Sequence, residues 1–140
     1  MQIVTRSLEF STNGNNHIID ITNMVQDLIK NTYLKEGNVL LSAVGSTTGI
    51  TTLEFEPGLV KKDVNDMFEN FAPYGKNYLH NQTWGDNNGA SHLRSMLTGT
   101  SLTLPFVKQK LILGTWQQIV FIDFDTRPRD RKVIVQCMGV

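Results

Sequence analysis

Apolar residues recur at two different spacings along the chain, and the two spacings predict different elements. Helical spacing, with apolar side chains three and four residues apart, occurs in two stretches: Ile21, Met24, Val25, Leu28 and Ile29, then Val60, Val64, Met67, Phe68 and Phe71. Asn88 or Ser91 could cap a third, shorter helix that ends at Gly99. The pattern therefore predicts three helices.

Alternating or continuous apolar runs of strand length occupy most of the remaining chain. They cover residues 2–11, 39–44, 50–55, 101–106, 110–113, 119–125 and 132–138. Most connections are too short for the crossovers that parallel strands need, so the strands should pair antiparallel. We expect an α+β fold with a mostly antiparallel β-sheet and three helices, in one domain over residues 1–140, whose C-terminal third is an antiparallel meander. Residues 12–16 should form a turn.

Length and charge narrow the classes of protein to consider. The chain has 140 residues, enough for one domain, and its 13 Lys and Arg balance its 13 Asp and Glu. Without a basic surplus, nucleic acid is not expected as a partner. No apolar run is long enough to cross a bilayer and no N-terminal leader is recognisable, so no membrane is expected and the location should be cytoplasmic. The single cysteine, Cys137, fits a reducing compartment.

The densest group of polar side chains lies in residues 78–92, a segment with almost no helix or strand period. It contains His80, Asp86, Asn88 and His92. Imidazoles transfer protons near neutral pH or bind transition metals, and a nearby carboxylate can fix the tautomer. The spacing of the two histidines matches no standard metal-ligand motif, and both could instead be surface or capping residues.

Two other segments offer anion or cation ligands. The loop Gly45–Gly49 presents hydroxyls at Ser46, Thr47 and Thr48 between two glycines, which suits either an anion nest or a tight polar turn. Glu54 and Glu56 face the same side of a predicted strand and could bind a cation, although Glu56 could equally cap the following helix.

The C-terminal third holds one large aromatic ring between strands and one arginine-rich turn. Trp116 could stack on a flat ligand or fill the core. Arg127, Arg129 and Arg131 sit around Pro128 with three aspartates close by, so a salt-bridged turn is as plausible as a phosphate clamp.

Four segments, in this order and spacing, resemble the YjbQ-like family (UPF0047). They are GSTTGITTLEFEPG from residue 45, NGASHLR from residue 88, LGTWQQI from residue 113 and DFDTRPRDR from residue 123. The resemblance covers essentially the whole chain. Where many members have His-Thr-Thr or His-Thr-Ser, this chain has Ser46-Thr47-Thr48.

The resemblance implies a homotrimer with a histidine-lined polar pocket and a secondary thiamine-phosphate synthase activity. That enzyme joins a pyrimidine diphosphate to a thiazole phosphate, usually with a divalent metal such as Mg or Zn. The alternative is a non-catalytic trimeric module that binds a small ligand or phosphate; in both cases the partner is a small phosphorylated metabolite. The expected roles are catalysis by His80, His92, Asn88 and Gln117, substrate or phosphate binding by Ser46, Thr47, Thr48, Arg94 and Trp116, and metal binding by His80, His92 and Glu54.

Overall fold

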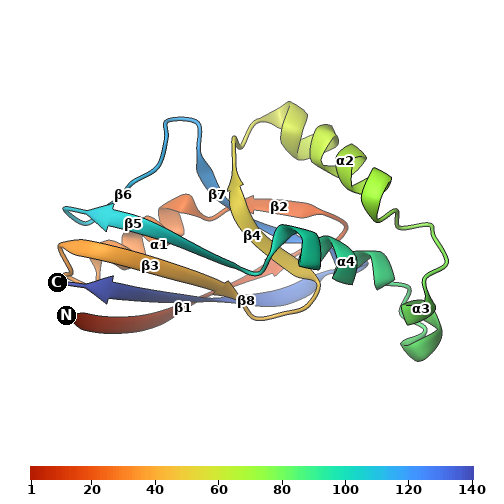
Figure 1. Ribbon diagram of the computed structural model, residues 1–140, viewed down its shortest axis with the longest axis horizontal. Coiled ribbons are helices and arrows are strands. Elements are labelled where there is room, and N and C mark those ends of the chain that lie inside the picture. Colours follow the sequence, from red (N-terminus) through yellow and green to blue (C-terminus); the bar gives the residue numbers. More distant parts are fainter.

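The computed structural model describes all residues, 1–140, and shows two antiparallel sheets with helices packed against them (Figure 1). The strands are β1 (Gln2–Thr12), β2 (His17–Asp20), β3 (Glu36–Ala43), β4 (Thr48–Leu53), β5 (Ser101–Val107), β6 (Lys110–Leu111), β7 (Gln118–Asp123) and β8 (Arg129–Gly139). The helices are α1 (Thr22–Lys30), α2 (Val64–Phe71), α3 (Leu79–Trp84) and α4 (Gly89–Thr98), and a π-helical turn, η1 (Leu59–Asp63), leads into α2. The predicted α+β class is confirmed.

The strands divide between a five-stranded sheet, in the order β1-β8-β3-β5-β6, and a three-stranded sheet, in the order β2-β7-β4. The predicted C-terminal meander is therefore wrong. Only β5 and β6 pair as a hairpin, because β7 joins the second sheet and β8 returns between β1 and β3. Each strand's own pattern was recognisable, but local patterns do not specify partners that lie more than a hundred residues away.

Strand β7 has apolar residues buried on both of its faces. Phe121 joins the larger core, which α1 closes, while Ile122 packs with Phe68 of α2 in the smaller core. A strand covered on both faces reads as a continuous apolar run rather than an alternation. This explains the continuous apolar run in the sequence. Because both cores hold β7 in place, the loops next to it are positioned as well.

Two short elements were missed. Helix α3 has no buried face, and strand β2 is short and directly follows a turn. Helix α3, in the segment expected to be irregular, buries none of its six residues, and Trp84 is 78% exposed. A helix without a buried face leaves no apolar stripe to detect. Strand β2 has only four residues and follows Asn15 and Asn16, which both have positive φ.

The segment before α2 decides the role of Glu56. Its carboxylate accepts hydrogen bonds from the backbone N–H groups of Gly58 and Leu59 at the start of the helical segment. Glu56 thus caps that segment, as one of the two sequence interpretations proposed.

None of the helices is long and apolar enough to cross a membrane.

Candidate functional site

A polar pocket of about 470 Å³ lies beside the loop between β3 and β4. Its lining comes from that loop, from α3, α4 and their connection, and from β8 and the turn before it: Gly45, Ser46, Thr47, His80, Trp84, Asp86, Asn88, His92, Asp125, Arg129 and Arg131. Trp84 is the one hydrophobic side chain among them. Such a surface suits a small, strongly hydrophilic ligand.

A close approach of α3 to the start of α4 brings the two histidines together. A Cβ on Gly89 would lie 2.7 Å from Cβ of Tyr78, so only glycine allows α4 to begin there. The N–H of Gly89 also donates to the side-chain oxygen of Asn81 at 3.0 Å. As a result, the ring centroids of His80 and His92 are 4.5 Å apart with an interplanar angle of 63°.

Asn88 occupies the N-cap position of α4, but its side chain serves the pocket instead of the helix. With its nitrogen toward Asp86, the amide donates to Oδ1 of Asp86 at 2.8 Å and to Nε2 of His80 at 3.0 Å. The opposite orientation would set the amide oxygen against the Asp86 carboxylate.

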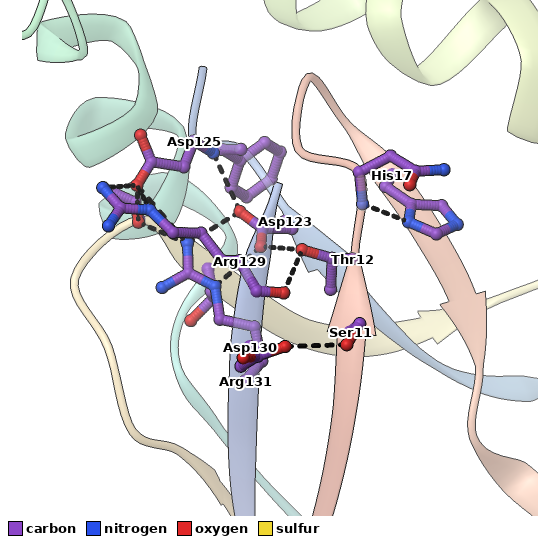
Figure 2. A network of polar contacts seen from close by, with 12 residues as sticks. Ser11, Thr12, His17, Asp123, Asp125, Arg129, Asp130 and Arg131 are labelled. Carbon is purple, nitrogen blue, oxygen red and sulfur yellow. Dashed lines mark hydrogen bonds and ion pairs between the residues drawn. The ribbon is translucent and has the colours of Figure 1, made fainter. Parts of the chain in front are cut away.

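Two arginine–aspartate pairs hold the arginines that line the pocket (Figure 2). Arg131 contacts the fully buried Asp123 through Nε at 2.6 Å and Nη2 at 2.8 Å, and Thr12 donates to the same carboxylate at 2.5 Å. Arg129 contacts Asp125 through Nε at 2.9 Å and Nη2 at 2.8 Å. Both guanidinium groups are thus held by buried carboxylates.

The pKa of Asp125 is lower than its ordinary value. Burial alone would raise this pKa, but the N–H of Thr126 and the Arg129 guanidinium outweigh burial by stabilising the charged form. Asp125 is therefore an anion at neutral pH and keeps Arg129 in place.

Several polar groups of the pocket have no hydrogen-bond partner within the protein. They are Nη1 of Arg129 and of Arg131, Oγ of Ser46 and the ring nitrogens of His92, none of which takes part in the side-chain hydrogen bonds of the chain. Arginine nitrogens, hydroxyls and imidazoles are the usual partners of phosphate oxygens. These unpaired groups therefore suit the binding of an anion.

Five of the expected site residues, His80, His92, Asn88, Ser46 and Thr47, line this one pocket. Thr48 lies behind it, buried, with its carbonyl bonded to the hydroxyl of Ser95. Asp86, Asp125, Arg129, Arg131 and Trp84 also line it, although none was among the expected site residues. The signal for the two arginines was present, since residues 129 and 131 share one face of a strand, but the neighbouring aspartates made a simple salt-bridged turn equally plausible.

Arg94, expected to bind phosphate, does not reach the pocket. It is fully buried, donates to the carbonyl of Ala72 at 2.9 Å, and pairs with Glu69 at 2.5 Å. Two residues along a helix rotate a side chain by about 200°, so Arg94 faces the protein interior when His92 faces the pocket. Arg94 instead joins α4 to α2.

Three further expected residues, Glu54, Trp116 and Gln117, lie at the other end of the β4–β7 pairing. Thr48 pairs with Asp123 beside the pocket, whereas Leu53 pairs with Gln118 at the far end. A six-residue strand rises about 3.3 Å per residue, which separates its ends by roughly 16 Å. Figure 1 shows the far-end loop, between β6 and β7, on the opposite side from the loop between β3 and β4.

The expected metal site of His80, His92 and Glu54 is not assembled, because Glu54 lies at that far end. No group of three or more His, Cys, Asp or Glu side chains in the chain could hold a metal ion. The residues present do not fit the Mg or Zn site that the resemblance implies.

Comparison with known proteins gives a consistent family and no activity. The family model described as "UPF0047 protein YjbQ-like" matches residues 6–140. A UPF0047 protein of Archaeoglobus fulgidus is 40% identical over 86% of this chain and 90% of its own length. The UPF0047 protein YugU of Bacillus subtilis is 32% identical over 96% of this chain and 98% of its own length.

A solved structure shares the fold. A YbjQ-like protein of unknown function from Sulfolobus solfataricus superposes with a TM-score of 0.88 at 25% identity, covering 99% of this chain and 100% of that chain. These relatives carry only a family designation or the description of unknown function. The expected thiamine-phosphate synthase activity is therefore wrong: none of these relatives is described as having it.

Proposed function

Because this chain belongs to the YjbQ-like family (UPF0047), whose relatives named above carry no assigned activity, we propose its function from the polar pocket: it binds a small phosphorylated metabolite. The observation that carries this proposal is the set of unused donors in one hollow. Nη1 of Arg129 and of Arg131, the ring nitrogens of His92 and Oγ of Ser46 all belong to residues that line this pocket and have no partner within the protein. Together they match the oxygens of a phosphate group.

The buried carboxylates support this role by positioning the arginines. A long arginine side chain loses rotamer freedom when it binds, and that loss weakens affinity. Here Asp123 and Asp125 already hold Arg131 and Arg129 through two contacts each. The ligand then meets donors that are fixed before it arrives.

The positive charge of the pocket lies on two side chains. Arg129 and Arg131 are the cationic residues of the lining, Asp86 and Asp125 match their charges, and the buried Asp123 lies against Arg131. The ligand is therefore bound by directed hydrogen bonds from the free arginine nitrogens and not by a surplus of positive charge.

The test is a titration with inorganic phosphate, followed by calorimetry, with two arginine variants of the same turn. Arg129→Gln removes a pocket donor, whereas Arg127→Gln changes an exposed arginine outside the pocket. Loss of a charge-assisted hydrogen bond costs about 1.5–3 kcal/mol, so R129Q should bind about 10-fold to 100-fold more weakly. R127Q should bind like the wild type. Undetectable binding by the wild type, or equal loss in both variants, would contradict the proposal.

We also propose that copies of this chain assemble, as a homotrimer, through an apolar groove of about 340 Å³ between α2, α4 and β4. Phe71 is 70% exposed there, beside Met67 and Leu97. Contiguous apolar surface of this kind marks protein interfaces.

Light scattering after size exclusion tests the assembly. Phe71→Asp and Leu97→Asp should each lower the mass from that of three chains to that of one. Tyr33→Asp, at an exposed aromatic outside the groove, should leave it unchanged. A wild-type protein with the mass of one chain, or trimers that persist in both groove variants, would refute it.

A further inference from the structure

A second hollow continues from the polar pocket and has no role in the proposal above. It has a volume of about 420 Å³ and shares Gly45, Ser46 and His92 with the pocket. It then extends over α4 and the chain that follows, past Ser95 and Met96, as far as Thr100. The two volumes together fall within the range of small-molecule sites.

Gly45 and Ser46 line both hollows, so the two hollows meet at the loop between β3 and β4. Arg131 lies close to this point: a Cβ on Gly45 would be 3.4 Å from Nη1 of Arg131, an ordinary contact distance. A ligand whose anionic group lies on Arg131 can therefore continue past Gly45 and Ser46.

The second hollow presents hydroxyls and one flexible apolar side chain. Oγ of Ser46 and Oγ1 of Thr100 form no hydrogen bond within the protein, whereas the hydroxyl of Ser95 is bonded to the carbonyl of Thr48 at 2.6 Å. Met96, 70% exposed, is the only hydrophobic residue of the lining, which contains no Phe, Tyr or Trp. Unpaired hydroxyls around a single thioether suit a ligand with alternating C–H and O–H groups better than a flat ring.

We propose that the metabolite is a phosphorylated sugar or polyol, with its phosphate on Arg129 and Arg131 and its hydroxylated carbon chain in the second hollow. This rests on the proposed phosphate binding and adds the identity of the organic part. Thr100 binds a hydroxyl group, Ser46 and His92 lie where the phosphate meets the carbon chain, and Met96 packs against that chain. Thr100 is then a specificity-determining residue that inorganic phosphate does not contact.

The experiment compares three probes in the Trp116→Phe protein. The chain has two tryptophans, so this variant leaves Trp84, at the pocket, as the only indole that reports binding by fluorescence. The probes are inorganic phosphate, n-propyl phosphate and a pentose 5-phosphate. The pentose 5-phosphate should bind at least 10-fold more tightly than either of the other two.

Two hydroxyl deletions locate the organic part. Thr100→Val should reduce the advantage of the pentose phosphate about 3-fold to 10-fold, since one hydrogen bond contributes about 0.5–1.5 kcal/mol. Ser46→Ala, at the edge shared with the phosphate site, should weaken the binding of all three probes. Thr100→Val should leave the affinity for inorganic phosphate unchanged. Thr103→Val, an exposed threonine on β5 outside both hollows, is the matched control and should have no effect.

The outcomes separate this inference from the proposed function. Equal affinity for all three probes, or a pentose advantage that survives Thr100→Val, overturns the sugar or polyol assignment and leaves phosphate binding standing. Absence of binding by every probe, checked by calorimetry, overturns both.

Discussion

The two ends of the β4–β7 pairing carry similar polar residue types but differ in how much hydrogen-bonding capacity remains. At the far end, the Gln117 amide accepts from the N–H of Gly114 and donates to Thr52, and Gln118 accepts from the N–H of Phe55. At the pocket end, Ser46, His92 and Nη1 of both arginines have no protein partner. Polar side chains consumed by a turn stabilise it, whereas those left unpaired beside a hollow are available to a ligand.

The largest expected effect concerns the buried support of the pocket end. Asp123→Ala would leave the Arg131 guanidinium buried without its carboxylate, and removing one partner of such a pair costs about 3–5 kcal/mol. Urea unfolding should show this loss in the free energy of unfolding. Asp130→Ala, which removes only an exposed hydrogen bond to Ser11, should change it by about 0.5 kcal/mol or less. Equal losses would show that the Asp123 pair has no special role.

Acid should remove the contribution of the second pair. The pKa of Asp125 is lowered from its ordinary value of 3.8, so its stabilising effect is fully present above that value and is lost as pH falls through the lower native pKa. Asp125→Asn should therefore be less stable than the wild type at pH 7, by about 1–3 kcal/mol for a lost charged hydrogen bond. The gap should narrow below pH 4. A gap that stays constant down to pH 2 would contradict this linkage.

The two imidazoles predict a loss of anion affinity that is confined to the pocket end. His80→Asn with His92→Asn should weaken sulfate binding about 3-fold to 10-fold, since a lost hydrogen bond costs about 0.5–1.5 kcal/mol. Calorimetric titration with sulfate measures this loss.

His17 provides the matched control for the two pocket imidazoles. His17→Asn should leave sulfate affinity within about twofold of the wild type, since His17 lies outside the pocket and its ring accepts from the N–H of Asn13. Unchanged affinity in the His80→Asn, His92→Asn protein would exclude the imidazoles from anion binding.

The smallest expected effect is at the far end. Gln117→Ala and Trp116→Phe should change phosphate affinity by less than about twofold, because both positions lie roughly 16 Å from the pocket along β4. Trp116 is 72% exposed, so its substitution should also change the free energy of unfolding little. A tenfold loss of affinity in either variant would mean that the two ends act together.

Much of the fold could be predicted from the sequence, because the apolar pattern of a long segment shows which of its faces is buried. The stripe from Ile21 to Ile29 and the apolar run of β7 follow directly from the cores that they enter. The partners of β7 and β8 could not be predicted, since strand pairing depends on contacts remote in sequence. Helix α3 has no buried side and therefore no periodic signal.

Site residues that lie close together in the sequence could be predicted. Site residues whose role depends on the direction in which the side chain points could not. His80, Asn88 and His92 lie together because one short connection carries them. Arg94, two residues beyond His92, looked equally available, but helical rotation turns it toward Glu69 and Ala72. Glu54 and Trp116 belong to segments as distinctive as the others, yet the length of β4 separates them from the pocket.

The most direct test of the central claim is an amide nuclear magnetic resonance titration of the protein with inorganic phosphate. The account predicts shifts that saturate together at residues 45–47, 80–92 and 125–131, and none at residues 54 or 114–118. Shifts centred on the far end, or scattered shifts that do not saturate, would contradict it.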